Sequence, residues 1–199
     1  MDYLELQRKN LNEDLSDIYN KIVNDKYNVD VVFFLGKGGL YIGQYFSEKF
    51  KCELGEILVS RKEPLFKKML KNMFRFLPKI LLKKMRSFEI NSGYHQKKSE
   101  RSVKINKLPN LTKNENLNIL IVDDSIDTGY SIKIAIESLL EKYPQGCEVR
   151  IASLNVFQDA FKVIKPNYYK YTDKAIIGPW SLDSIEYTEF ITNYKKWLS

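Results

Sequence analysis

Length, composition and charge set the first limits. The chain has 199 residues, 44% hydrophobic and 29% charged, with a formal net charge of +7. These values exclude a disordered, collagen-like or repeat-type chain, and the length predicts one domain. Cys52 and Cys147 are too few for a disulfide framework and lack the spacing of a zinc site. Because the sequence has neither a signal-peptide pattern nor a long apolar stretch, we expect a cytoplasmic protein without a membrane span.

The strands and helices are expected to alternate along the chain. We predict an opening amphipathic helix over 3–26, strands at 30–35, 53–60, 88–91, 117–122, 148–157 and 175–177, and helices at 41–50, 130–143 and 184–198. Residues 92–116 are polar and lack periodicity, so most of this stretch is predicted to be a mobile loop. The expected class is α/β, with a central parallel sheet of about five strands and ligands beyond the carboxyl ends of the strands.

The positive charge is concentrated in one segment. Residues 61–86 contain ten Lys or Arg and one acidic residue, whereas the rest of the chain has 22 basic and 24 acidic residues. Apolar and basic side chains fall on opposite faces of a helical wheel there, until Pro78 breaks or kinks the helix. We therefore predict a basic amphipathic insertion at about 61–87.

Residues 64–86 of this insertion suggest three kinds of partner. The segment could pack on the domain or on a second subunit. It could also lie on the anionic inner face of the cytoplasmic membrane. Nucleic acid is disfavoured, because the aromatic side chains lie on the apolar face rather than among the basic residues.

The most informative segment is 120–131, with the sequence LIVDDSIDTGYS. An apolar strand leads into Asp123 and Asp124, and a turn follows where a helix is expected to begin. The turn consists of Asp127, Thr128, Gly129, Tyr130 and Ser131. Backbone N–H groups and hydroxyls at such a turn form a cradle for phosphate. Carboxylates would repel a bare phosphate, so they are expected to bind sugar hydroxyls or a divalent cation of the same ligand. Helix capping alone would explain one of these acids, not three.

This pattern resembles the signature of the type I phosphoribosyltransferases, in particular the hypoxanthine/xanthine-guanine enzymes. These enzymes transfer phosphoribose from 5-phosphoribosyl-1-diphosphate (PRPP) with the help of Mg²⁺. The resemblance implies a Rossmann-like sheet with a small hood, in one phosphoribosyltransferase domain over 1–199. It also implies that Asp123 and Asp124 hold the ribose hydroxyls of PRPP and contribute to binding Mg²⁺. The turn at 127–131 would bind the 5′-phosphate, and Asp127 would act as general base.

Two further loops resemble the family. The first is expected to bind the diphosphate and comprises Gly36, Lys37, Gly38 and Gly39. The family often has a cis peptide before this lysine. The second, at 91–95, falls where the family has a flexible catalytic loop with a Ser–Tyr pair. A glycine separates Ser92, assigned to phosphate binding, from Tyr94, assigned to catalysis. His95, the only histidine, is expected to be solvated there.

The hood is expected at about 165–199, together with the N-terminal region. Within it, Lys174 matches the family lysine that reads the 6-oxo group of a purine, and Ile176 and Trp180 are assigned to the acceptor. Asp183 matches an acid that binds magnesium with the diphosphate, so the predicted metal ligands are Asp123, Asp124 and Asp183.

One hood position departs from the family. The residue after Lys174 is normally an aromatic that stacks on the purine, but here it is Ala175. Stacking on an aromatic side chain contributes roughly 1–3 kcal/mol per base. Trp180 or Tyr168 would have to replace it, although Trp180 is more simply explained as a packing residue.

Three functions stay open on these residues. The first is PRPP-dependent transfer to a 6-oxopurine in purine salvage, which Lys174 favours. The second is transfer to a sugar hydroxyl of a lipid-linked or surface glycan, which Ala175 and the basic insertion favour. The third is a PRPP-sensing regulator of the same fold that binds nucleic acid. A homo-oligomer is expected in each case.

Overall fold

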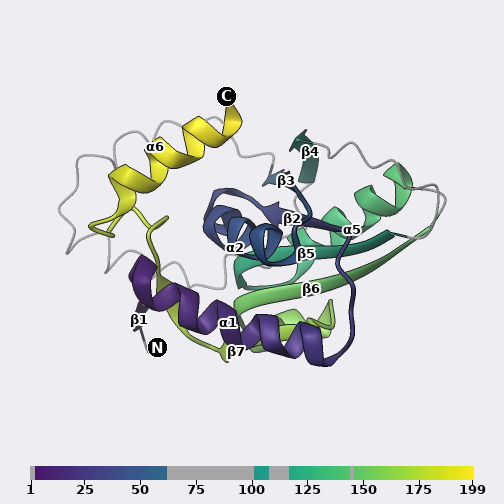
Figure 1. The fold of residues 1–199 in the computed structure, drawn as a ribbon, viewed down its shortest axis with the longest axis horizontal. Coiled ribbons are helices and arrows are strands. Elements are labelled where there is room, and N and C mark those ends of the chain that lie inside the picture. Colours follow the sequence, from purple (N-terminus) through teal and green to yellow (C-terminus); the bar gives the residue numbers. More distant parts are fainter. Residues whose placement is uncertain (1–2, 62–100, 108–116, 144–145) are drawn as a thin grey trace.

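The computed structural model describes residues 3–61, 101–107, 117–143 and 146–199 (Figure 1). Its elements in chain order are β1 (Tyr3–Glu5), α1 (Arg8–Asn24), β2 (Val31–Leu35), the 3-10 turn η1 (Lys37–Gly39), α2 (Leu40–Phe50), β3 (Glu53–Arg61), β4 (Arg101–Lys107), β5 (Leu117–Ile126), α5 (Tyr130–Lys142), β6 (Cys147–Val156), the 3-10 turn η3 (Gln158–Lys162), β7 (Tyr168–Thr172), β8 (Ala175–Ile177) and α6 (Tyr187–Leu198). None of the described helices is long and apolar enough to span a membrane.

The central sheet positions the two turns singled out in the sequence. Its strand order is β4-β3-β2-β5-β6-β7, and every neighbouring pair is parallel except β3 and β4. From β2 the chain steps outward to β3 and later returns to the other side of β2 as β5. Such a reversal opens a crevice at the carboxyl ends of the two strands. Because β2 ends at Leu35 and β5 ends at Ile126, the turns that follow them meet at this crevice.

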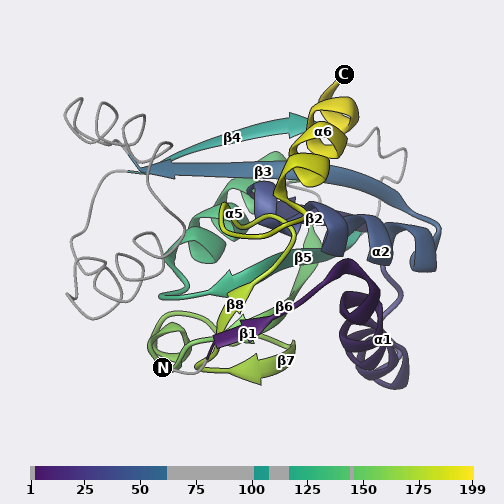
Figure 2. The same ribbon diagram turned by 90° about the vertical axis from the view of Figure 1, so that its left-hand side faces the viewer.

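Both faces of the sheet are buried, and successive side chains alternate between them. On β2, Val32 and Phe34 pack in a cluster with residues of α1, α2 and α6, whereas Val31, Phe33 and Leu35 pack in a second cluster with residues of α5. Figure 2 shows α1 and α2 together on one side of the sheet, with α5 across from them. A strand buried on both faces has no polar positions, which explains the uninterrupted apolar run at 31–35.

Several predicted elements are confirmed and others are wrong. The strands expected at 30–35, 53–60, 117–122 and 148–157 correspond to β2, β3, β5 and β6. The loop predicted over 92–116 is wrong at β4, which pairs antiparallel with β3. Val103 and Ile105 pack against the α5-side cluster, while the residues next to them in the strand, Ser102, Lys104 and Asn106, are polar. Two apolar residues that alternate with polar ones are a weak strand signal within a polar sequence.

The hood prediction also changes in detail. Residues 168–172 form β7, the edge strand of the central sheet, rather than part of the hood. Residues 175–177 form β8, which pairs with β1 in a separate two-stranded sheet. Residues 3–5 therefore form a strand, where the sequence predicted helix. The strand expected at 88–91, the basic insertion and the loop at 91–95 lie outside the described residues.

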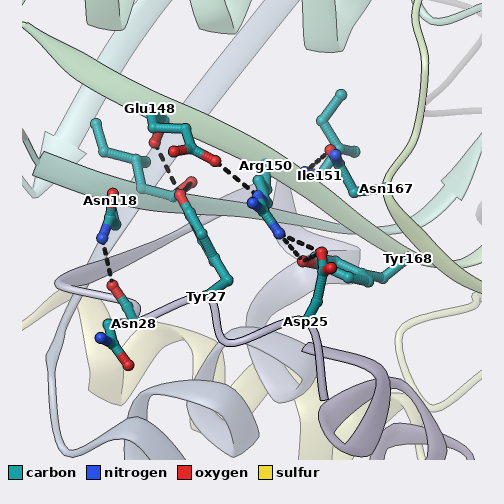
Figure 3. A network of polar contacts seen from close by, with 10 residues as sticks. Asp25, Tyr27, Asn28, Asn118, Glu148, Arg150, Ile151, Asn167 and Tyr168 are labelled. Carbon is teal, nitrogen blue, oxygen red and sulfur yellow. Dashed lines mark hydrogen bonds and ion pairs between the residues drawn. The ribbon is translucent and has the colours of Figure 1, made fainter. Parts of the chain in front are cut away.

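A polar network ties the ends of α1, β6 and β7 together (Figure 3). The Arg150 guanidinium pairs with Asp25 and Glu148, donates to the Tyr168 hydroxyl at 2.5 Å, and lies 4.2 Å from the centre of the Tyr27 ring. The hydroxyl of Tyr27 donates to the backbone carbonyl of Glu148 at 2.8 Å. Tyr168 is only 4% exposed and is engaged in this network, so its ring cannot stack on an acceptor base.

The two packed faces predict a clear difference between core and surface leucines. Leu120, on β5, is fully buried, whereas Leu140, on α5, is 47% exposed. We expect Leu120→Ala to lower the free energy of unfolding by about 2–5 kcal/mol. The matched change Leu140→Ala should alter it by no more than about 0.5 kcal/mol. Urea unfolding checks both, and equal losses would contradict this assignment of the core.

Candidate functional site

The turn that follows β2 touches the carboxyl end of β5. A Cβ atom placed on Gly38 would lie 2.6 Å from Oδ1 of Asp124 and 2.8 Å from its Cγ. No side chain fits there, so the backbone of the 36–39 turn lies directly against the carboxylate. The structure thus brings together two motifs that are more than eighty residues apart in the sequence.

Gly36 shapes the start of its turn. Its φ of 61° and ψ of −179° belong to a region that is essentially restricted to glycine. Its N–H donates to the carbonyl oxygen of Ile57 on β3 at 2.9 Å, which fixes the turn to the sheet. All peptides of the described residues are trans, including the one between Gly36 and Lys37.

Asp123 and Asp124 lie side by side at the end of β5. Both are half-buried, and the backbone N–H of Asp124 donates to Oδ1 of Asp123 at 2.9 Å. Burial and then the negative charge of Asp124 raise the pKa of Asp123 well above 3.8, and Asp127 adds to the effect. A ligand that supplies hydroxyl donors or a positive charge would relieve this repulsion.

The turn after β5 opens into a small pocket at the beginning of α5. The pocket has a volume of about 80 Å³ and is lined by Asp123, Ser125, Ile126, Asp127, Thr128, Gly129, Ser131 and Ile132. Gly129 has a φ of 75°, and a Cβ there would lie 2.8 Å from a side-chain carbon of Ile164. Exposed Tyr130 begins α5, whose N-terminal N–H groups and dipole favour an anion.

Asn155 is a site residue that the sequence analysis missed. It is fully buried at the carboxyl end of β6, and its Oδ1 accepts from the backbone N–H of Lys174 at 2.9 Å. Its Nδ2 donates to the Ser125 hydroxyl at 3.2 Å, next to Asp124 in the chain. One buried amide therefore connects the predicted base-reading segment to the predicted ribose-binding strand. The signal in the sequence is a pair of polar residues, Ser153 and Asn155, within the apolar second half of β6.

The remaining hood residues are placed as follows. Ile176 is 5% exposed and packs in the cluster with α1, α2 and α6, so its side chain belongs to the core. The Trp180 ring lies against Gly178, where a Cβ would come within 2.4 Å of it. The indole N–H of Trp180 is buried and has no hydrogen-bond partner among the described residues.

The predicted metal ligands do not gather into one cluster. The described residues contain no group of three or more His, Cys, Asp or Glu that could hold a metal ion, so half-buried Asp183 does not join the pair on β5. Mg²⁺ is commonly held by one or two carboxylates together with substrate phosphates. Asp123 and Asp124, which lie beside an anion pocket, therefore suit a metal ion that takes its remaining ligands from the substrate. Ser92, Tyr94 and His95 lie outside the described residues.

The comparison with known families decides the class of the protein. The model of the phosphoribosyl transferase domain matches residues 3–185. The chain belongs to this family. The phosphoribosyltransferase family predicted from the sequence, the α/β fold and the assignment as a transferase enzyme are therefore confirmed.

Solved structures share the fold of this phosphoribosyltransferase at low sequence identity. A purine phosphoribosyltransferase from Pyrococcus horikoshii Ot3 is 20% identical with a TM-score of 0.61, covering 91% of this chain and 95% of that one. The xanthine-guanine-hypoxanthine phosphoribosyltransferase of Helicobacter pylori is 16% identical with a TM-score of 0.57, covering 97% and 99%. A hypothetical protein from Neisseria gonorrhoeae with bound ppGpp is 14% identical with a TM-score of 0.61, covering 98% of each chain. No curated protein sequence matches the chain.

The acidic pair predicts an unusual effect of mutation on stability. The pKa of Asp123 lies above 3.8 in the folded protein, so the folded state binds this proton more tightly than the unfolded state. The free energy of unfolding then falls as the pH rises from about 3.8 through the folded-state pKa. Asp123→Asn removes the ionisable group and with it this fall in the free energy of unfolding. The variant should be more stable than the wild type at pH 7, by about 0.5–2 kcal/mol, and the difference should shrink toward pH 4.

A second aspartate, whose pKa is shifted in the opposite direction, provides a control. A hydrogen bond from Lys170 lowers the pKa of Asp17, which lies on the surface of α1. Asp17→Asn should therefore give no gain in stability at pH 7. Thermal unfolding at several pH values checks both variants, and a loss of stability in Asp123→Asn at pH 7 would contradict the repulsion described above.

Proposed function

We propose that this phosphoribosyltransferase transfers the 5-phosphoribosyl group of PRPP to a 6-oxopurine base and releases diphosphate. The observation that carries the proposal is the Asn155 bridge. It ties Lys174, which matches the lysine that reads a 6-oxo group, to the strand that presents Asp123 and Asp124. A base held at Lys174 would be fixed relative to a ribose held at these acids. Two of the structures with this fold are described as purine phosphoribosyltransferases, which is consistent with the proposal.

Each part of PRPP has a matching group in the crevice. The pocket at 126–132, with the Thr128 and Ser131 side chains and the N-terminus of α5, suits the 5′-phosphate. The adjacent acids suit the ribose 2′- and 3′-hydroxyls, which would donate hydrogen bonds to them. The backbone of the 36–39 turn suits the diphosphate, because glycine allows close approach. These groups would hold the sugar while its anomeric carbon acquires positive charge.

Magnesium is expected to accompany the diphosphate. When bound, Mg²⁺ would neutralise charge on the diphosphate and so favour its departure. Asp123 and Asp124 are the proposed protein ligands, and Asp183 is proposed to bind the same ion through water.

In the reaction, the bond between the anomeric carbon and the diphosphate oxygen breaks as a bond to a ring nitrogen of the base forms. The base loses an N–H proton from its ring, and Asp127 is proposed to receive this proton. Asp127 is exposed at the mouth of the pocket, within the same turn that would hold the 5′-phosphate. This position suits a group that contacts an acceptor arriving from solvent.

The aromatic that the family places after Lys174 has a candidate replacement in Tyr3. Ala175 on β8 is the direct partner of Tyr3 on β1. Paired residues project from the same face of a sheet. Tyr3 is 44% exposed, so its ring is accessible beside Ala175. We propose that Tyr3 contributes the stacking surface for the base.

The acceptor is tested by incubating the purified chain with PRPP, Mg²⁺ and hypoxanthine, guanine or xanthine in turn and following diphosphate release. Adenine is the control, because it lacks the 6-oxo group. We expect turnover with at least one 6-oxopurine and little with adenine. PRPP binding without turnover on any base would overturn the purine acceptor, and would direct attention to a glycan acceptor or a regulator.

Asp127 provides a test of the proton transfer. General bases typically contribute about 10²–10⁴-fold to a rate. Asp127→Asn should therefore lower kcat at least about a hundredfold, while calorimetry shows PRPP binding close to that of the wild type. Unchanged turnover would remove Asp127 from the mechanism.

Tyr3 provides a test of the stacking surface. Since stacking contributes about 1–3 kcal/mol, Tyr3→Leu should raise the KM for the purine at least about fivefold and leave the KM for PRPP unchanged. Tyr3→Phe keeps the ring and should behave like the wild type. Steady-state kinetics checks both, and an equal effect of the two variants would exclude a role for the ring.

A further inference from the structure

The C-terminal helix α6 reaches the turn that is proposed to bind diphosphate. The family match ends at residue 185, so α6 lies wholly beyond it. The Lys37 ammonium lies 5.4 Å from the centre of the Tyr194 ring, within the range of a cation–π interaction. Lys37 is exposed and immediately precedes Gly38, whose backbone lies against Asp124. A residue outside the family match thus contacts the one basic side chain of the 36–39 turn.

A buried carboxylate fixes the Tyr194 ring. Glu56 on β3 is fully buried, and its Oε1 accepts from the Tyr194 hydroxyl at 2.5 Å. Its Oε2 accepts from the side-chain amide of Asn106 on β4 at 2.6 Å. Burial and the adjacent Glu56 raise the pKa of the Tyr194 hydroxyl, which therefore remains a donor at neutral pH. The hydrogen bonds from Tyr194 and Asn106 hold the Glu56 side chain between them, and the first holds the Tyr194 ring in one orientation.

Other contacts keep α6 docked independently of Tyr194. The Trp197 ring meets Phe34 edge-on, with ring centres 4.9 Å apart, and its carbonyl oxygen accepts from the Lys107 ammonium. At the preceding turn, the amide of Asn193 donates to the Tyr41 hydroxyl at 2.9 Å. These contacts are too many for the helix position to depend on one ring. The contact between Tyr194 and Lys37 can therefore be separated from the docking of the helix.

We propose that Tyr194 is a positioning residue for Lys37, and that α6 thereby prepares the 36–39 turn to receive the diphosphate of PRPP. This role rests on the proposed function of that turn. A free lysine samples many rotamers, and ordering such a side chain on binding lowers affinity. The Tyr194 ring restricts the ammonium to the neighbourhood of the turn before PRPP arrives, and the Glu56 carboxylate restricts the ring. Glu56 and Tyr194 act through Lys37 and are not proposed to contact the substrate.

The central measurement is the Kd for PRPP in the presence of Mg²⁺, determined by calorimetry on the full chain. Tyr194→Leu should weaken binding about two- to fivefold, the size of an exposed cation–π interaction. Tyr194→Phe keeps the ring but loses the hydrogen bond to Glu56, so its Kd should lie between those of the wild type and of Tyr194→Leu. Tyr194→Leu leaves Glu56 buried without this donor, so Glu56→Leu/Tyr194→Leu replaces it if the single variant does not fold.

Two further variants distinguish positioning from general damage. Trp197→Leu removes another aromatic ring from the same end of α6, and should leave the Kd for PRPP unchanged. In a Lys37→Ala background, adding Tyr194→Leu should weaken binding no further, because the two side chains act through one contact. A weaker Kd in Trp197→Leu equal to that in Tyr194→Leu, or additive effects with Lys37→Ala, would overturn the proposal.

A measurement without substrate separates this proposal from the function on which it rests. The Tyr194 ring current should shift the Lys37 Cε protons in an NMR spectrum, and the shift should persist in Tyr194→Phe and disappear in Tyr194→Leu. A wild-type chain that shows this shift but does not bind PRPP would overturn the proposed function, and this role with it. PRPP binding that is insensitive to Tyr194→Leu would overturn the positioning role alone.

Discussion

The close approach between the Gly38 backbone and the Asp124 carboxylate is the constraint on which the site depends. It requires β2 and β5 to be neighbours in a fixed register, and it requires the residue at 38 to have no side chain. The strand order provides the first condition, because the chain reverses direction across the sheet between these strands. The register provides the second, because Phe34 pairs with Val122, and Asp124 therefore lies two residues further along β5, beside the turn that follows Leu35. The chemistry at the crevice is therefore a consequence of how the core packs.

The same crevice carries an electrostatic cost that the core must offset. The negative charges of Asp124 and Asp127 act against the ionised form of Asp123, whereas the hydrogen bond from the Asp124 backbone N–H favours it. A stable fold tolerates this because β5 is buried over most of its length and hydrogen-bonded on both sides. Proteins commonly retain such unfavourable groups where a ligand relieves them.

Much of the fold and part of the candidate site could be predicted from local sequence. The apolar run before Asp123 and the glycines at 36–39 are local patterns, and strand–helix alternation places them at one sheet edge. β4 and β7 could not be predicted in this way, because short edge strands with polar or tyrosine-rich sequences owe their structure to the neighbour with which they pair. The contacts of Asn155 and Tyr194 join residues that are far apart in sequence, so no spacing rule indicates them.

The pairing of β1 with β8 joins residues about 170 positions apart, from opposite ends of the matched domain. Bringing such distant segments together requires closing a very long loop, which slows the formation of the contact. During synthesis, β2, α2 and β3 emerge long before β8, whereas β1 must wait for it. The small sheet is therefore expected to form only after the central sheet has assembled around β5 and β6. On this order of events, the chain forms the proposed phosphate-binding edge first, and the proposed acceptor side of the crevice is completed last.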